Sequence, residues 1–263
     1  MNLKTLFVLG VLLLTNSITF AEKPKNLSVR IEFGGNEVNT SLNESWNIRQ
    51  DVGSYNYESG NSSNSVSTDM YVTHFGIKPE MLFFDDKIAI STGLRFSHIA
   101  SDLSMVYNNN SARNFFYLRY NDNGLNTEFA RVSAINQSNN YIGIPLDVKL
   151  LPFSIYKFDF YIKTGIELNF KVGSKTNIDF VNDEMNEYQD LIMKGVGVKV
   201  NGIYSTWSSA LGVAFGSKDK LRYNLEFLLP SYFLTQNNSS LVNSDMFTGF
   251  QLSIQFPLIN SSK

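Results

Sequence analysis

The chain has 263 residues, of which 43% are hydrophobic and only 17% charged, a composition that excludes an intrinsically disordered protein. Its 22 lysines and arginines are balanced by 24 aspartates and glutamates, and the net charge of -2 excludes the basic surface of a nucleic-acid-binding protein. Cysteine is absent, which excludes disulfides, cysteine-ligated metal centres, thiol catalysis and lipid attachment to an N-terminal cysteine.

Residues 1–21 have the pattern of a secretory signal peptide. Lys4 supplies a positive charge, residues 6–14 form an apolar run, and a small-x-small cleavage site ends at Ala21. The apolar run is about half of the roughly 20 residues that a membrane-spanning helix needs, so we interpret it as a cleaved signal rather than an anchor. We therefore expect export, and a single β-barrel domain over residues 22–263.

Beyond this segment, hydrophobic residues recur at every second position, which predicts strands with one apolar and one polar face. In residues 27–33, for example, Leu27, Val29 and Ile31 share one face, while Arg30 and Glu32 share the other. The same alternation predicts eight strands, at residues 27–33, 71–83, 88–98, 141–150, 158–172, 203–215, 221–229 and 247–258.

The links between these strands alternate in length. Short links at 84–87, 151–157 and 216–220 alternate with long, Asn- and Ser-rich links at 34–70, 99–140, 173–202 and 230–246. In an up-and-down sheet this places all tight turns at one end and all large loops at the other, as in bacterial outer-membrane barrels. The sequence therefore predicts an all-β fold, an eight-stranded antiparallel up-and-down transmembrane β-barrel with periplasmic turns and external loops.

The polar faces of the predicted strands carry charges of both signs. An unpaired charge in a narrow lumen would cost several kcal/mol, so we expect these side chains to converge and neutralise one another. An eight-stranded barrel is only wide enough for its own side chains, which predicts a plugged polar lumen rather than an open pore. The predicted lumen network consists of Arg30, Glu32, Lys78, Glu80, Arg95, Asp147, Lys149, Asp159, Lys163, Glu167, Arg222 and Glu226.

Two stretches resemble a known family. Residues 140–149 read Asn-Tyr-Ile-Gly-Ile-Pro-Leu-Asp-Val-Lys, and after a short turn residues 160–168 read Phe-Tyr-Ile-Lys-Thr-Gly-Ile-Glu-Leu. Together they resemble the central hairpin of the outer-membrane β-barrel family typified by the PorT-like proteins of Bacteroidetes, which are associated with type IX secretion. The hairpin at 79–93 is similar to another strand pair of that family. The resemblance implies residence in the cell outer membrane of a Gram-negative bacterium, transfers no catalytic residue, and leaves a secretion role as one option.

Candidate catalytic and metal-binding groups are few. Alternation directs His74 into the lumen and His98 outward, so we expect no shared metal site. Some eight-stranded barrels are lipid A deacylases that use a histidine and a serine on one face of a strand. Here Ala100 stands two residues after His98, and Ser101 falls on the opposite face. We therefore expect no enzyme, catalytic residue, metal or cofactor.

The long links carry two further patterns. Residues 114–120, Asn-Phe-Phe-Tyr-Leu-Arg-Tyr, form an aromatic island that we expect to extend strands above the membrane. Residues 179–188 form an acidic run that we interpret as a solvated loop.

The resulting hypothesis is a monomeric, non-enzymatic integral outer-membrane protein. Its expected partners are the outer-membrane lipid bilayer and secretion-system or surface proteins, and its expected role is structural, adhesive or secretion-accessory. Two alternatives stay open, a barrel enzyme that modifies outer-membrane lipid and a soluble secreted lipocalin-like binding barrel. In the lipocalin-like case Ile144 and Ile162 would meet at a dry centre and Lys163 would lie in water.

Overall fold

The computed structural model describes residues 26–49, 66–105, 115–122, 126–196, 199–217 and 220–260. The predicted signal peptide, residues 1–21, lies outside these described residues. The barrel wall is built from β1 (Asn26–Leu42), β3 (Val66–Phe83), β4 (Ile88–Thr92), β5 (Leu94–Met105), β7 (Asn126–Ile155), β8 (Phe158–Phe180), β9 (Ile203–Phe215), β10 (Arg222–Phe233) and β11 (Val242–Asn260).

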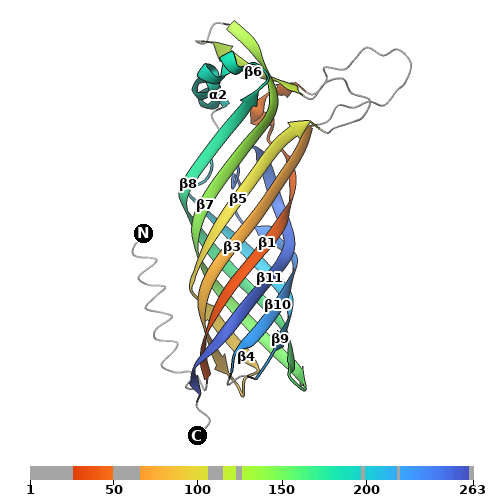
Figure 1. Cartoon of the computed structure of the whole chain (residues 1–263), viewed down its shortest axis with the longest axis vertical. Helices are drawn as coiled ribbons and strands as arrows, with labels where there is room; N and C mark the ends of the chain where they lie inside the picture. The colour runs from red at the N-terminus through yellow and green to blue at the C-terminus, as the bar shows by residue number, and fades with distance from the viewer. Residues whose placement is uncertain are drawn as a thin grey trace, which may run out of the picture.

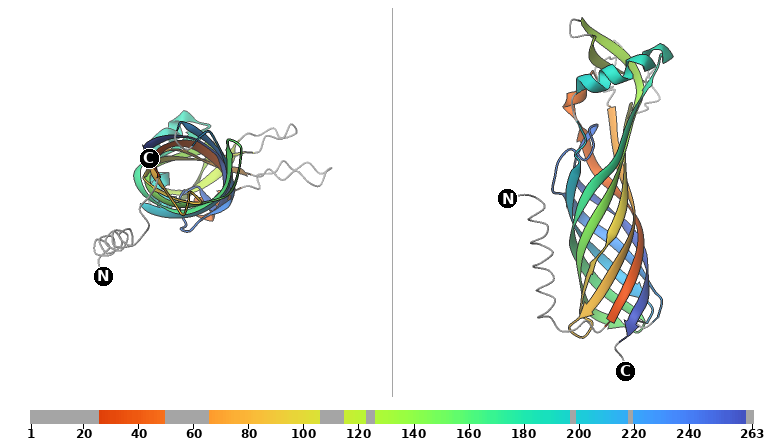
Figure 2. Two further views of the ribbon diagram at one scale, coloured as in Figure 1. Left: turned by 90° about the horizontal axis from the view of Figure 1, so that it is seen from below. Right: turned by 90° about the vertical axis from the view of Figure 1, so that its left-hand side faces the viewer.

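These strands close into a ring in chain order (Figures 1 and 2). Every neighbouring pair is antiparallel, and the ring closes because β1 pairs with both β3 and β11. β4 and β5 act as one wall strand between β3 and β7, interrupted at Gly93, where a Cβ atom would lie 2.2 Å from the carbonyl oxygen of Ile77. The predicted eight-stranded antiparallel up-and-down barrel is confirmed.

The strands are longer than predicted. β7 has 30 residues and β8 has 23, whereas alternation predicted strands at 141–150 and 158–172. Much of the predicted loops at 34–70, 99–140 and 173–202 therefore continues the barrel wall away from the short turns. The second predicted turn, at 151–157, is also shorter, since only Tyr156 and Lys157 separate β7 from β8.

A small cap lies at the end of the barrel opposite the short turns (Figure 1). It consists of β6 (Phe116–Asp122), β2 (Ile48–Arg49), the 3₁₀ segments η1 (Glu44–Trp46) and η2 (Asp183–Tyr188), and the helix α2 (Gln189–Val196). β6 pairs with the far end of β7, and β2 pairs with β6. The aromatic island thus forms a strand as predicted. The acidic run is largely exposed, as predicted, but it contains the end of β8 and η2 rather than an irregular loop.

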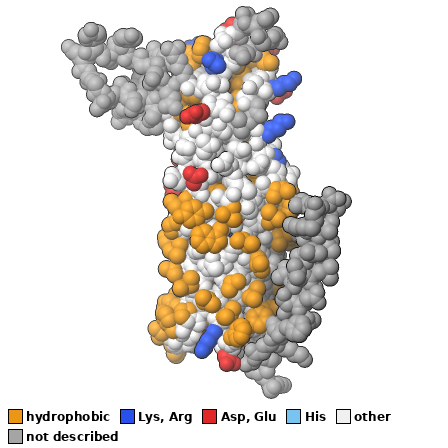
Figure 3. Space-filling view, turned by 180° about the vertical axis from the view of Figure 1, so that it is seen from behind, with side chains coloured by type: hydrophobic (Ala, Val, Ile, Leu, Met, Phe, Trp, Pro, Cys, Tyr) orange, Lys and Arg blue, Asp and Glu red, His pale blue; other side chains and the backbone are white. Residues whose placement is uncertain are grey.

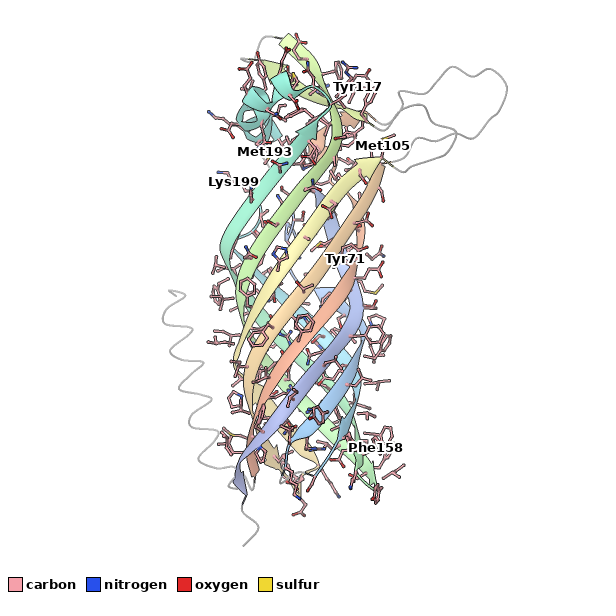
Figure 4. The ribbon with its side chains drawn as sticks, viewed as in Figure 1. Tyr71, Met105, Tyr117, Phe158, Met193 and Lys199 are labelled. Atoms are coloured by element: carbon pink, nitrogen blue, oxygen red, sulfur yellow. The ribbon has the colours of Figure 1, made fainter. Side chains whose placement is uncertain are left out.

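An apolar belt surrounds the half of the barrel nearer the short turns (Figure 3). Every wall strand contributes large hydrophobic side chains to it, among them Ile31, Ile77, Ile90, Phe96, Ile144, Ile162, Leu211, Leu225 and Ile254, each between 37% and 53% exposed. Phe158 marks the turn end of the belt, and Tyr71 lies near mid-height (Figure 4). No helix in the described part of the chain is long and apolar enough to cross a membrane.

Candidate functional site

The lumen at the level of the apolar belt holds all twelve predicted charged residues. Eleven of them are at most 7% exposed, and the side chain of Arg95 is 14% exposed. Each is a sequence neighbour of outward-facing residues, since strand side chains alternate between faces. Lys163, for example, follows the exposed Ile162, and Glu226 lies between the exposed Leu225 and Phe227. The set contains six cations and six anions, so its formal charges cancel.

Arg30 lies at the centre of this network and is completely buried. Its Nη1 atom lies 3.0 Å from Oε1 of Glu226 and 3.6 Å from Oε2 of Glu80. Its Nη2 atom lies 3.6 Å from Oδ2 of Asp147 and donates a hydrogen bond of 3.3 Å to Oγ of Ser91. One guanidinium therefore joins acids that come from β3, β7 and β10.

Two further cations extend the network toward the cap. Nζ of Lys78 lies 2.7 Å from Oδ2 of Asp147 and 2.9 Å from Oε1 of Glu32. Arg95 pairs with Glu32 and also lies 2.6 Å from Oε2 of Glu167. Glu32 is thus shared between two cations from different strands.

Further ion pairs lie toward the turn end of the lumen, and two of them share their acids with Arg30. Lys149 donates to Oε2 of Glu80 at 2.9 Å, and Arg222 pairs with Asp159. Across the lumen Lys163 pairs with Glu226, whose Oε1 also accepts a hydrogen bond of 2.9 Å from the hydroxyl of Tyr161. These contacts link β3, β7, β8 and β10. Every wall strand except β4, β9 and β11 contributes a charged side chain to the network.

Two neutral glutamines on β11 complete the network, although sequence reasoning placed no network role on them. Nε2 of Gln251 donates to Glu226 at 2.9 Å and to Glu32 at 3.1 Å, and its Oε1 accepts from Arg95 at 3.2 Å. Gln255 donates to Glu80 at 3.1 Å. Alternation predicted the inward position of both glutamines, but the predicted network included only charged residues and therefore omitted them.

Above the belt the interior becomes apolar while the outer wall becomes polar. This reversal was not predicted, because the links there were assigned to loops. Trp46 from η1, Leu118 from β6 and Ile192 from α2 pack against inward side chains of the wall. The largest side chains of this upper core are Trp46, Met70, Ile99, Leu103, Phe116, Leu118, Ile135, Tyr141, Ile178 and Ile192, each at most 2% exposed. The cap therefore closes this end of the barrel over a largely apolar core.

The link between β10 and β11 folds into the upper barrel, and we call residues 234–241 the inward loop. The side-chain amide of Gln137 on β7 makes two hydrogen bonds to this loop. Its Nε2 donates to Oγ of Ser240 at 2.6 Å, and its Oε1 accepts from the backbone N–H of Ser240 at 2.8 Å. The indole nitrogen of Trp46 donates to the carbonyl of Ser240 at 2.7 Å. Ser239 and Leu241 are completely buried. The inward loop thus obstructs the lumen above the charged network.

A cavity of about 30 Å³ lies between the charged network and the upper core, lined in part by His74, Arg95 and Glu167. A water molecule needs roughly 10–15 Å³ of such volume, so this space accommodates about two waters and no larger solute. The buried Oδ1 of Asn36, which has no protein partner, also lines it and can accept a hydrogen bond from such a water.

The histidines occupy the predicted faces of the wall. His74 is buried in the lumen, where Nε2 lies 3.1 Å from Oε1 of Gln251. His98 faces outward with Nδ1 2.8 Å from Oδ1 of Asn140, whereas Ser101 is completely buried on the inner face. Within the described ranges, no group of three or more histidine, cysteine, aspartate or glutamate side chains is arranged to hold a metal ion.

No family model and no curated protein matches the sequence. Among solved structures, the chain is similar to the outer membrane protein OprG from Pseudomonas aeruginosa, with 12% identity, a TM-score of 0.42, and coverage of 90% of this chain and 98% of that one. It is also similar to the translocator domain of the autotransporter NalP from Neisseria meningitidis, with 8% identity, a TM-score of 0.28, and coverage of 96% and 95%. The PorT-like resemblance stays a prediction.

Proposed function

We propose that the protein is an integral outer-membrane β-barrel with a closed lumen, which anchors the cap outside the membrane. The observation that supports this most strongly is the orientation of side chains in the belt. Ile162 is 49% exposed, whereas the adjacent Lys163 is 3% exposed. In water, exposing the apolar side chains and burying the charged ones would be unfavourable. A bilayer stabilises apolar side chains on the outside of the barrel, and it requires the backbone groups to pair within a closed ring.

The dimensions of the belt support the same proposal. On β8 the outward hydrophobic positions run from Phe158 to Val172, which is fifteen residues and long enough to cross a bilayer. A tilted transmembrane strand needs about 9–11 residues to cross the hydrocarbon core. A soluble lipocalin-like barrel would instead turn Ile144, Ile162, Leu225 and Ile254 inward, and all four are exposed.

We further propose that the barrel is non-conducting and non-enzymatic. The ion-paired side chains fill the lumen at the level of the belt. Above the belt, the inward loop and the upper core close the lumen. On β5, His98 and Ser101 lie on opposite faces, so they do not form the same-face pair of a lipid-acting barrel enzyme. The ring closes within one chain, which supports a monomer.

In this proposal the cap is the functional region. It provides a rigid surface for structural, adhesive or secretion-accessory contacts with other surface proteins. The charged network holds together the strands that carry the cap. The long strands β7 and β8 place the cap above the belt. Export through the signal peptide and residence in the outer membrane belong to the same proposal.

Fractionation and protease shaving of intact cells test location and topology together. We expect the protein to require detergent for extraction and to migrate faster on gels before heating than after it. Cleavage should be confined to the cap end of the barrel, and should not occur at the turns 84–87 or 156–157. Recovery of the protein in soluble periplasm without detergent would overturn the proposal.

Reconstitution into planar bilayers tests the closed lumen separately. We expect no steady conductance from the wild-type protein, because the interior cavity has room for about two waters. Regular single-channel steps from the native protein would show that the lumen conducts and would refute this part of the proposal.

A further inference from the structure

The outer wall contains a depression at the upper edge of the apolar belt, with a volume of about 310 Å³. It spans β1, β3, β10 and β11, and we call it the Gly35 depression. The outward residues that line it are Gly35, Glu37, Tyr71, Thr73, Phe227, Thr248 and Phe250. This volume lies at the lower end of the range of about 300–1,000 Å³ that is typical of ligand sites.

The depression exists because Gly35 has no side chain. In the sheet Gly35 pairs with Thr73 on one side and with Phe250 on the other, so the missing side chain leaves a gap between them. A Cβ atom at Gly35 would meet no other atom within 4 Å, and its φ is not in the left-handed region. By contrast, a Cβ at the inward Gly34 would lie 2.6 Å from the ring of His74. Neither packing nor backbone conformation therefore requires glycine at position 35.

The lower side of the depression is continuous with the lipid-facing belt. The next outward row toward the turns contains Phe33, Phe75 and Leu252, which are 61%, 48% and 58% exposed. Aromatic rings from Phe227 and Phe250 form one side wall, with centroids 5.1 Å apart. A hydrocarbon chain in the bilayer can enter the gap from below without crossing a polar surface.

The upper side of the depression is polar. Glu37 occupies the next outward row, between Tyr71 and Thr248. Its carboxylate is exposed, and no cationic partner for it is found among the residues that the structure describes. Thr73 and Thr248 place hydroxyl donors beside it. A carboxylate attracts an ammonium group, and hydroxyls can donate to a phosphate oxygen.

We propose that the Gly35 depression binds one phospholipid, with part of an acyl chain in the gap beside Gly35 and an ammonium-bearing headgroup at Glu37. This inference rests on the proposed membrane residence, because only a bilayer presents a lipid to the outer wall. The combination of an apolar lower side, a gap of this size and an anionic upper side favours a zwitterionic ethanolamine headgroup over an anionic glycerol headgroup.

Native mass spectrometry of the full-length mature protein tests the proposal. The protein in mild detergent is incubated with dioleoyl phosphatidylethanolamine or dioleoyl phosphatidylglycerol, which share their acyl chains. We expect one retained lipid per barrel, with a preference of about threefold to tenfold for the ethanolamine lipid. Glu37→Gln should remove this headgroup preference and leave chain-dependent retention.

Two matched variants isolate the depression. Gly35→Phe should fill the gap and lower retention of the ethanolamine lipid by about tenfold, the effect of 1.4 kcal/mol on a binding constant. Gly202→Phe adds the same side chain at another open outer position, where a Cβ also meets nothing within 4 Å, and should retain lipid like the wild type. Heat-dependent gel migration establishes that each variant has folded.

Equal lipid retention by the wild type and Gly35→Phe would overturn the inference, as would equal losses in Gly35→Phe and Gly202→Phe. Equal binding of both lipids by the wild type would refute the role of Glu37 as a headgroup site. In all these cases a detergent-requiring, heat-modifiable barrel would leave the proposed membrane residence intact. A protein that is soluble without detergent would instead refute membrane residence itself.

Discussion

Tyr161 of β8 lies directly over Gly212 of β9. The two residues are paired in the sheet, and a Cβ atom on Gly212 would lie 2.2 Å from Cζ of the tyrosine ring. On its other side Gly212 pairs with Glu226 of β10, whose Oε1 accepts the hydrogen bond of Tyr161. The glycine thus provides the space in which side chains from β8 and β10 meet across β9.

Gly212→Ala should therefore destabilise the barrel. The added methyl group would displace the buried Tyr161 ring and weaken its bond to Glu226, and overpacking of this kind costs about 1–3 kcal/mol. Urea unfolding in micelles, followed by tryptophan fluorescence, measures the change. Gly202→Ala is the matched control because a Cβ there meets nothing within 4 Å. Equal midpoints for both variants would contradict the packing role of Gly212.

Glu226→Gln tests the charged network at an acid that pairs with both Arg30 and Lys163. The change leaves Lys163 without its partner and Arg30 without its shortest ion pair, both inside the lumen. Breaking a buried pair in this way costs about 3–5 kcal/mol, far more than the loss of an exposed pair. The same unfolding measurement applies, with Glu37→Gln as the exposed control. A loss as small as that of the control would show that the network does not hold the wall together.

The side-chain orientation within the belt could be predicted from sequence because a strand has a period of two. Lys78 and Asp147 both fall on polar faces, so their inward position follows from alternation alone. Their 2.7 Å contact does not follow, since it depends on the register of β3 and β7, which are separated by β4. Register arises from pairing over the whole ring and is not encoded in any single strand.

The upper half of the barrel was not predictable in the same way. Alternation continues there, but Met70 and Ile135 face inward while Asp69 and Asn136 face outward. Polar outward residues above the belt have the composition of loops, and the sequence pattern does not mark the level at which the outer face of a continuing strand changes from apolar to polar. Only the pairing of these segments shows that the wall continues.

Gln137→Leu should release the inward loop. The substitution removes the acceptor of the Ser240 amide and the donor to its hydroxyl, and a buried polar group left unpaired costs about 1–3 kcal/mol. Hydrogen exchange should therefore accelerate at the amides of Ser240 and Leu241, with little change in β1 or β3. Asn243→Ala, which alters an exposed residue of β11, is the control. Unchanged exchange at Ser240 would show that Gln137 does not hold the loop.

Asp69 and Asp102 stand directly opposite one another on the outer face of β3 and β5, above the belt. Partial burial, and secondarily the carboxylate of Asp69, raise the pKa of Asp102. A carboxyl group whose pKa is raised on folding binds its proton more tightly in the folded state, so it lowers stability as the pH rises through its pKa values.

Asp102→Asn should accordingly stabilise the protein at pH 7, by about 0.2–1 kcal/mol for a cross-strand pair of like charges. The advantage should vanish below about pH 3, where the carboxyl is protonated in both the folded and the unfolded state. Paired urea titrations of wild type and variant at both pH values measure the difference. Asp69→Asn removes the same repulsion but leaves the carboxylate of Asp102 partly buried, so it should give a smaller gain. A stabilisation that persists unchanged at low pH would mean that it arises from the amide and not from the removal of charge repulsion.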